Sequence, residues 1–360
     1  MAKSESPVRV ALLGCGRVAQ HYRAMLTERG VTGFRIVGCC DLDPAKARDM
    51  AQTFDAQAYT DGDAMLAEAK PDLVCVLTPS GTHHAMACKA LAAGCHVLVE
   101  KPVTLIPAQV EELANYASQM RRMATVMFQN RFNPAIRALK EAYDAGRFGK
   151  LVTATIRVRW CRTQDYYDDE WHGTWAQDGG VINQQAIHHV DALGWICGGI
   201  KSVSAKATRR LNDLEAEDTM VASVEFANGA LGTIEATTSA RPRDFEASLS
   251  VVGEKGMVLV GGIALNRIDT WTFVEPQPGD DTVPERCSQD VPTGYGLSHA
   301  TVLQEIFDRL RAGSIAAPVP VEDAGRAVWL VHALYASDEQ RRWVDMAERA
   351  VSARLGAVQP

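Results

Sequence analysis

The chain has 360 residues, a length that corresponds to two domains at roughly 150 residues per domain. Hydrophobic residues make up 47% of the sequence and charged residues 22%, a composition that excludes a disordered chain, a collagen-like fibre and a coiled coil. The 37 basic and 44 acidic residues leave a net charge of −7, which argues against electrostatic binding to nucleic acid or to an anionic membrane.

The nine cysteines have no CxxC spacing, and most of them lie in apolar runs such as residues 73–76. This usage is typical of reduced, buried thiols in a cytoplasmic protein, and it argues against a zinc site. Residues 1–7 are polar and too few for a signal peptide, and no apolar run reaches the roughly 18 residues that span a bilayer. We therefore expect a cytoplasmic protein without a metal site.

The first third of the chain alternates short apolar runs with helical segments. The expected strands are residues 8–13, 34–40, 73–77, 96–99 and 124–128, with a weaker candidate at 56–59. Helices are expected over residues 17–29, from residue 44, and over 85–92 and 107–120. Continuous apolar strands separated by helices predict a parallel sheet covered on both faces, which is a doubly wound Rossmann domain of the α/β class.

After about residue 150 the pattern changes to long strands and tight turns. The expected strands are residues 151–160, 203–210, 219–226, 231–238, 247–252 and 257–260, and one helix is expected over 180–195. Turn signals between them indicate an open, mainly antiparallel sheet. We expect an NAD-binding domain over residues 1–128 and a substrate-binding and oligomerisation domain over 129–360. A homodimer or homotetramer formed through the second sheet is the expected assembly.

The segment Gly14-Cys-Gly-Arg-Val-Ala19 follows the first strand and opens a helix. This G-x-G-x-x-A pattern lets the backbone approach a pyrophosphate at a helix N-terminus. Asp41 ends the second strand, where a carboxylate would bind the adenosine ribose and repel a 2′-phosphate. The pair favours NAD over NADP, although Arg17 is a counter-signal because it could bind that phosphate. The alternative is a structural turn without a ligand.

Two further polar stretches follow later strands of the same sheet. Thr78-Pro-Ser-Gly-Thr-His83 follows the third clear strand, and Glu100-Lys-Pro102 follows the fourth. Ligands of open α/β sheets bind at the carboxyl ends of the strands. A lysine there, Lys101, could donate to a sugar hydroxyl or accept its proton. The alternative is a solvated surface lysine.

A second candidate site lies at the expected helix 180–195. Gln184 and His188 are four residues apart, so they would share one helix face. Gly179 and Gly180 before them would let the backbone approach a ligand closely. His188 could act as a general base toward a hydroxyl, with Asp191 supporting the helix or the ring. The alternative is a satisfied core histidine. The neighbouring His189 would point elsewhere on the helix, and we interpret it as structural.

Together these motifs resemble the glucose–fructose oxidoreductase/inositol dehydrogenase (Gfo/Idh/MocA-type) superfamily, from about residue 8 to about residue 311. Four stretches of the second domain are similar to the UDP-N-acetylglucosaminuronate 3-dehydrogenases, which make diaminated uronic acids for bacterial surface polysaccharides. These stretches are residues 160–167, 171–175, 178–180 and 261–266.

The resemblance implies NAD-dependent oxidation of a ring hydroxyl, at C3, of a UDP-linked N-acetyl amino sugar or uronate. It implies that His188 or Lys101 accepts the hydroxyl proton, without deciding between them. The implied substrate contacts are Arg162, Thr163, Gln164, Tyr166, Tyr167, Gln184 and Gln185. The implied NAD contacts are Gly14, Gly16, Arg17, Val18, Ala19, Asp41, Thr78, Pro79, His83, Glu100, Lys101 and Gln129. Trp171 and Trp175 are interpreted as packing residues.

One residue departs from the family pattern. Gln184 stands where the superfamily usually has aspartate and the uronate enzymes have asparagine. An amide can hydrogen-bond a sugar hydroxyl but cannot act as a base, so the sugar itself stays open. The alternative functions are a dehydrogenase of a free monosaccharide or cyclitol, and a non-catalytic NAD-binding regulator. The presence of both Lys101 and His188 argues against the regulator.

Overall fold

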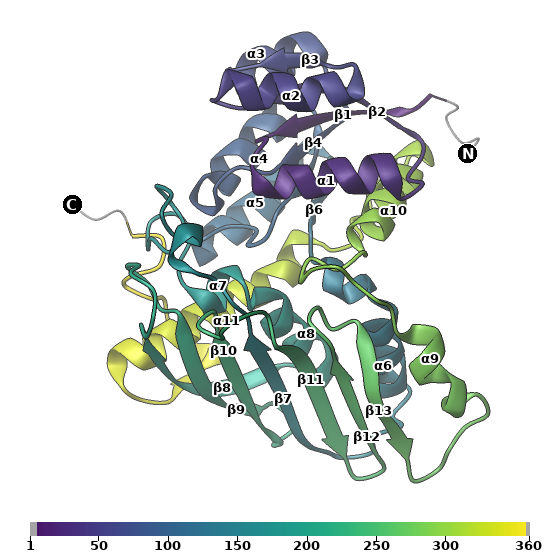
Figure 1. The fold of residues 1–360 in the computed structure, drawn as a ribbon, viewed down its shortest axis with the longest axis vertical. Helices are drawn as coiled ribbons and strands as arrows, with labels where there is room; N and C mark the ends of the chain where they lie inside the picture. Colours follow the sequence, from purple (N-terminus) through teal and green to yellow (C-terminus); the bar gives the residue numbers. More distant parts are fainter. Residues whose placement is uncertain (1–5, 358–360) are drawn as a thin grey trace. The chain divides into compact units, whose positions relative to one another are not determined.

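The computed structural model describes residues 6–357 and divides into two compact units (Figure 1). The first contains the residues up to Phe128 together with Leu297–Gly325, and the second contains Gln129–Gly296 and the residues from Arg326 onward. The expected boundary after residue 128 coincides with this division. Residues 297–325 differ from the expectation, because they belong to the first unit. Residues 1–5, part of the segment judged not to be a signal peptide, lie outside the described range.

The first unit is built on a six-stranded parallel sheet, with strand order β3-β2-β1-β4-β5-β6. Its strands are β1 (Val8–Leu13), β2 (Phe34–Cys40), β3 (Gln57–Tyr59), β4 (Leu73–Val76), β5 (His96–Val99) and β6 (Ala124–Val126). Its helices are α1 (Arg17–Glu28), α2 (Pro44–Phe54), α3 (Gly62–Ala69), α4 (His83–Ala92), α5 (Pro107–Met120) and α10 (His299–Arg311). The predicted doubly wound Rossmann fold is confirmed, but α3 and α10 are not among the expected helices.

Helix α10 explains why residues 297–325 join the first unit. Its apolar face, which includes the buried residues Leu303 and Phe307, packs beside α1 and β1. The ring of Phe307 stacks on that of Phe34 with 5.2 Å between the ring centroids. The helical pattern of this segment shows that it must bury one face, but it does not show which sheet covers that face.

Strand register brings four loops to one edge of the parallel sheet. Leu13 is paired with Cys40 and with Val76, and Val76 is paired with Val99. The segments that follow β1, β2, β4 and β5 therefore leave the sheet at the same level. This is the edge at which ligands bind in folds of this kind.

The second unit is built on an eight-stranded sheet in which only β7 and β10 are parallel, with order β13-β12-β11-β7-β10-β9-β8-β14. Its strands are β7 (Leu151–Arg159), β8 (Ile200–Thr208), β9 (Thr219–Phe226), β10 (Leu231–Thr237), β11 (Glu246–Gly253), β12 (Gly256–Gly261), β13 (Arg267–Phe273) and β14 (Val344–Asp345). Its helices are α6 (Pro134–Asp144), α7 (Val181–Gln184), α8 (Ile187–Cys197), α9 (Val283–Cys287) and most of α11 (Val321–Gln340). The predicted mainly antiparallel sheet is confirmed.

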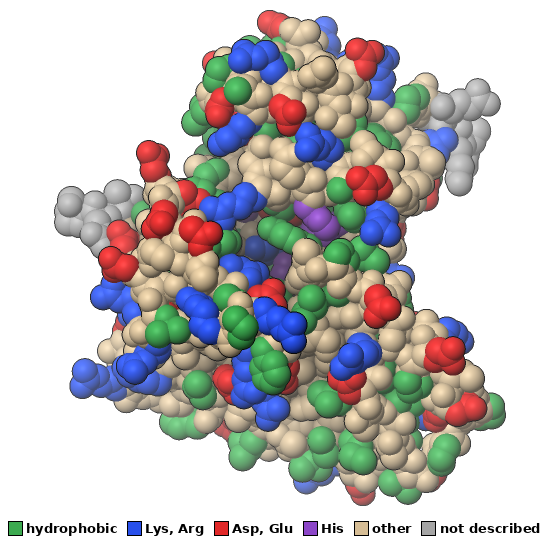
Figure 2. Space-filling model, viewed as in Figure 1, with side chains coloured by type: hydrophobic (Ala, Val, Ile, Leu, Met, Phe, Trp, Pro, Cys, Tyr) green, Lys and Arg blue, Asp and Glu red, His purple; other side chains and the backbone are tan. Residues whose placement is uncertain are grey.

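The surface charges and the cysteines can be compared with what the composition indicates. On the face shown in Figure 2, acidic and basic side chains are mixed over both units. All nine cysteines are free thiols, and six of them are buried. Within residues 6–357, no helix is long and apolar enough to cross a membrane.

Candidate active site

The glycine-rich turn after β1 has the geometry that a dinucleotide requires. Gly14 has φ +98°, and a Cβ at this position would lie 2.6 Å from the carbonyl oxygen of Leu77, so only glycine fits. A Cβ on Gly16 would meet no described atom within 4 Å, so the space beside it is open. No side chain among the described residues caps α1. The backbone donors of a helix start and an open approach fit a pyrophosphate.

Asp41 ties the end of β2 to this turn. Its carboxylate oxygens accept hydrogen bonds from the backbone N–H of Cys15 at 2.7 Å and from that of Asp43 at 2.8 Å. Each carboxylate oxygen can accept more than one hydrogen bond. Asp41 therefore holds the loop in place and retains the capacity to bind a ribose hydroxyl. These features of the turn fit the NAD that the sequence implies.

The loop after β4 is fixed by His83 from within. His83 is 1% exposed, and its ring nitrogens lie 2.7 Å from the carbonyl oxygen of Pro102 and 2.8 Å from that of Thr78. Burial lowers the pKa of His83 to about 4, and the hydrogen bonds to the two carbonyl oxygens oppose this shift. The buried ring therefore links the segment after β4, through Thr78, to the segment after β5, through Pro102.

Glu100 and Lys101 follow β5. Glu100 is buried and accepts hydrogen bonds from the Tyr22 hydroxyl at 2.9 Å and from the Lys101 N–H at 3.1 Å. Burial raises the pKa of Glu100, and the nearby ammonium of Lys101 opposes this rise. Tyr22, on α1, fixes the residue beside the candidate proton acceptor. No pattern in the sequence indicates this contact, because a tyrosine on a buried helix face is typical of packing.

The second unit brings four candidate residues together inside the protein. Gln129, Gln184, Gln185 and His188 are each less than 8% exposed. The amide nitrogen of Gln129 lies 3.4 Å from Nε2 of His188. An amide nitrogen only donates, so Gln129 can donate to His188 when Nε2 carries no proton. Gln129 was expected among the NAD contacts, and the structure places it against the candidate base.

The expected helix 180–195 is two helices, so the prediction that Gln184 and His188 share a face of one helix is wrong. Helix α7 ends at Gln184 and α8 begins at Ile187. The N–H of Ala186 donates to the carbonyl of Val181, five residues earlier, at 2.8 Å. This wide turn resembles a π-bulge, a feature found at many functional sites.

The backbone at Gly180 approaches a protein side chain instead of the expected ligand. A Cβ on Gly180 would lie 2.1 Å from Oε2 of Glu217. Glu217 was not among the residues predicted from the sequence, since a single glutamate in a short connection carries no recognisable pattern. It lies against the segment that leads to Gln184.

Asp191 supports α8 through an ion pair. It receives two hydrogen bonds from Arg131, at 2.7 Å to Oδ2 and 2.6 Å to Oδ1, and the two side chains are 3% and 8% exposed. The Arg131 guanidinium also lies 5.1 Å from the ring centroid of Trp195. His189 is fully buried, with its ring 5.6 Å from that of Trp160. Burial lowers the pKa of His189 to about 3, which fits a packing role.

The candidate substrate segment after β7 mixes exposed and anchored side chains. Arg162 donates to Asp244 at 2.9 Å, and its guanidinium lies 5.7 Å from the ring centroid of Tyr166. The hydroxyl of Tyr167 is buried and bonds Thr238. Thr163 bonds Asp165, and the Gln164 side chain bonds the backbone of Asp213.

Two family matches cover most of the chain. Residues 8–128 match the oxidoreductase family with an NAD-binding Rossmann fold, and residues 136–259 match the GFO/IDH/MocA C-terminal domain. The chain is 30% identical to the scyllo-inositol 2-dehydrogenase (NAD(+)) of Bacillus subtilis, over 86% of this chain and 88% of that protein. It is 28% identical to the D-glucoside 3-dehydrogenase of Escherichia coli, over 68% of this chain and 74% of that protein.

The fold is also that of a solved dehydrogenase. The WlbA dehydrogenase of Bordetella pertussis, determined in complex with NADH and UDP-GlcNAcA, is 32% identical to this chain. The two structures superpose with a TM-score of 0.89 over 95% of this chain and 98% of that one. The chain therefore belongs to the GFO/IDH/MocA family and is an NAD-dependent oxidoreductase of the sugar and cyclitol dehydrogenases.

Proposed function

We propose that this enzyme oxidises the C3 hydroxyl of a UDP-linked N-acetyl amino sugar or uronate, for the synthesis of bacterial surface polysaccharides. The observation that carries the proposal is the buried polar cluster around His188. Oε1 of Gln129 and Nε2 of Gln185 are buried without a hydrogen-bond partner among the described residues. Buried polar atoms need partners, and the hydroxyl and amide groups of a sugar would supply them.

The nucleotide part of the substrate is inferred from two features. UDP-GlcNAcA, with which the WlbA dehydrogenases form their complexes, belongs to this class. Arg162, beside the rings of Trp160 and Tyr166, is suited to a diphosphate, a carboxylate or a base. We therefore assign the substrate contacts to Arg162, Gln184 and Gln185, together with Thr163, Gln164, Tyr166 and Tyr167.

The reaction needs a group that removes the hydroxyl proton. Bound NAD supplies the hydride acceptor. His188 can serve as a general base in the tautomer whose Nε2 carries no proton, and in this tautomer it can accept from the Gln129 amide. Lys101, at the carboxyl end of β5, is the second candidate. Gln184 would orient the sugar through its hydroxyls.

We also propose that the second unit self-associates through the open face of its sheet. Val221, Leu231 and Met257 are 52%, 61% and 48% exposed. The strand register places them on the same face, opposite the one covered by α8. Figure 2 shows hydrophobic side chains among charged ones over these strands. We expect these apolar residues to lie in the contact between copies of the chain.

A substrate panel tests the proposed function through the absorbance of NADH. We expect kcat/KM for a UDP-linked uronate to exceed that for the free sugar by about 100-fold, the equivalent of one strong charge-assisted hydrogen bond to the diphosphate. Equal rates would favour the free-sugar dehydrogenase, which the names of the Bacillus and Escherichia relatives also suggest. No turnover of UDP-sugars, free sugars or cyclitols would favour a regulator.

Asp41 should set the preference for NAD over NADP. Its carboxylate would face the 2′-phosphate, so Asp41→Ser should narrow the ratio of the two affinities by about tenfold or more, as expected for a like-charge repulsion. Asp43→Ser is the matched control, because Asp43 lies in the same loop and caps α2. Titration of each variant with both cofactors checks the expectation. Equal affinity of the unmodified protein for NAD and NADP would contradict it.

A further inference from the structure

The first turn of α7 takes its hydrogen-bond partners from distant parts of the chain. The N–H of Gly180 donates to the Tyr335 hydroxyl at 3.0 Å, and that of Val181 donates to the Glu217 carbonyl at 2.9 Å. The N–H of Ile182 donates to Oε1 of Glu217 at 3.0 Å. The Tyr335 hydroxyl donates to the same oxygen at 3.0 Å. Glu217 and Tyr335 thus satisfy donors that a helix start leaves unpaired.

The carboxyl group of Glu217 is pressed against this turn. Its side chain is buried, and a Cβ on Gly180 would lie 2.1 Å from Oε2. That oxygen has no hydrogen-bond partner within residues 6–357. A buried carboxylate with one unpartnered oxygen lowers stability, so its placement at the start of α7 requires a functional explanation.

We propose that Glu217 is a positioning residue for the sugar site, whose carboxylate fixes the first turn of α7 and thereby the amides of Gln184 and Gln185. The proposal rests on the proposed function, because that function gives these amides their sugar contacts. Helix α7 has only four residues, so the whole helix lies within about one turn of the N–H groups that donate to Glu217. The chain then enters α8, which carries His188.

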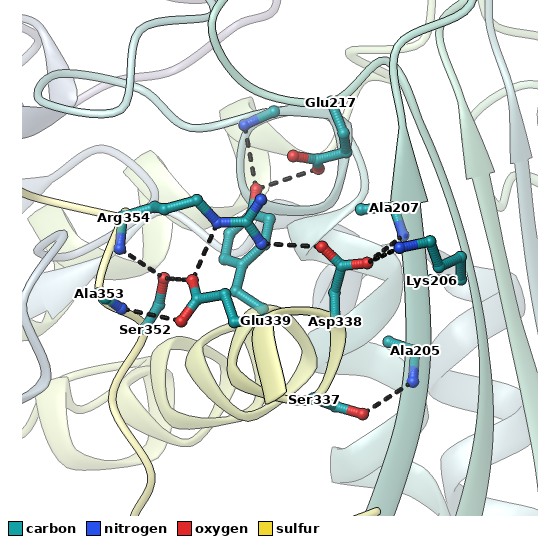
Figure 3. Close-up of polar contacts among 12 residues, drawn as sticks. Ala205, Lys206, Ala207, Glu217, Ser337, Asp338, Glu339, Ser352, Ala353 and Arg354 are labelled. Carbon is teal, nitrogen blue, oxygen red and sulfur yellow. Dashed lines mark hydrogen bonds and ion pairs between the residues drawn. The ribbon is translucent and has the colours of Figure 1, made fainter. Parts of the chain in front are cut away.

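The charged groups around Glu217 in the described part of the chain leave its charge without a bonded cation. From the C-terminal segment, the charge of Arg354 lowers the pKa of Glu217 slightly against the effect of burial, but its hydrogen bonds go to Glu339 and Asp338, each at 2.9 Å. Figure 3 shows these bonds directed away from Glu217. From α11, Glu217 is faced by the neutral Tyr335, whose pKa is raised by burial and then by the Glu217 charge. Asp178, in the loop before α7, interacts with that tyrosine and adds a further negative charge.

The charge of Glu217 should therefore change near neutral pH. Burial raises the pKa of Glu217 to about 7. A carboxylate holds an N–H donor more strongly than a neutral carboxylic acid does, so α7 should be firmly held above this pH and looser below it. Stability should respond in the opposite sense. Because the pKa of Glu217 is higher in the folded protein than in the unfolded chain, where it is about 4.5, the residue contributes to the free energy of unfolding. This contribution is complete below about pH 4.5 and is lost as the pH rises through about 7.

Melting curves provide the first test. Glu217→Gln keeps an oxygen that can accept from Ile182 and Tyr335 but removes the titration. We compare the melting temperature of this variant with that of the unmodified protein at each pH. The difference, variant minus unmodified protein, should be about 2–4 °C larger at about pH 8 than at about pH 5. Glu339→Gln is the matched control, because Glu339 belongs to the cluster in Figure 3 but bonds Ser352, Ala353 and Arg354. It should show no such rise.

Hydrogen exchange tests the position of α7 directly. At about pH 8, the amides of residues 180–188 should exchange roughly threefold to tenfold faster in Glu217→Gln, since a neutral acceptor replaces a charged one. At about pH 5.5 the two proteins should match. Tyr335→Phe, which removes the hydroxyl between Gly180 and Glu217, should speed exchange of the same peptide. Glu339→Gln should leave it unchanged.

Kinetics separates positioning from chemistry. In Glu217→Gln at about pH 8, KM for the sugar should rise by the same threefold to tenfold, with kcat within about twofold. Unchanged exchange and unchanged KM at both pH values would overturn the proposal. If the substrate panel shows no turnover, only the proposed function is contradicted. Hydrogen exchange in residues 180–188 and the melting curves need no substrate, so they still support or overturn the role of Glu217.

Discussion

Replacing His188 with alanine should lower turnover of the sugar by about 10²–10⁴-fold, the usual contribution of a general acid or base. The imidazole is buried beside the Gln129 amide. NAD affinity should stay within about twofold, because the effect is confined to the chemical step. Steady-state rates and a separate titration with NADH measure the two quantities.

Lys101→Ala and the double variant decide whether both residues serve one hydroxyl. The two residues belong to different units, so their cooperation is a prediction about kinetics. If they act as one relay, the double replacement should cost much less than the product of the two single losses. Gln184→Ala provides the comparison, since it should raise KM with a smaller effect on kcat. Near-normal turnover in His188→Ala would make that residue a packing histidine and leave Lys101 as the candidate base.

Replacing Asp191 with alanine should destabilise the protein by about 3–5 kcal/mol, because it leaves the buried Arg131 charge without its partner. The two side chains share two short hydrogen bonds and are almost inaccessible to water. Asp144→Ala is the matched control, because it removes the Lys140–Asp144 pair on α6, in which Asp144 is 58% exposed. That change should cost less than about 1 kcal/mol.

Urea unfolding of both variants measures the difference. A loss below about 1 kcal/mol in Asp191→Ala would mean that water or a rearranged Arg131 replaces the pair. The expected loss should also lower activity, because Asp191 lies one turn after His188 on α8. Asp191→Asn keeps the size of the side chain and part of its hydrogen bonding, so it should give an intermediate value.

Much of the first unit was predictable from local sequence. Fully apolar runs such as β4 require burial on both faces, so they predict a parallel sheet whatever the rest of the chain does. Gly14 and Asp41 could be predicted as NAD contacts from the sequence, because the turn and the strand end that contain them are fixed by neighbouring residues. The order of strands in the second sheet was not predictable, since alternating patterns reveal a strand but not its neighbour.

The sequence by itself determined the Rossmann fold and its NAD-binding domain, and it predicted a polar site at Gln184 and His188. Only the tertiary structure decided what those residues contact. His188 contacts Gln129, 59 residues away, Asp191 pairs with Arg131, 60 residues away, and Glu217 meets Tyr335, 118 residues away. The physical reason is that propensity and periodicity act over a few residues, whereas the partner of a buried polar group is chosen when distant segments pack.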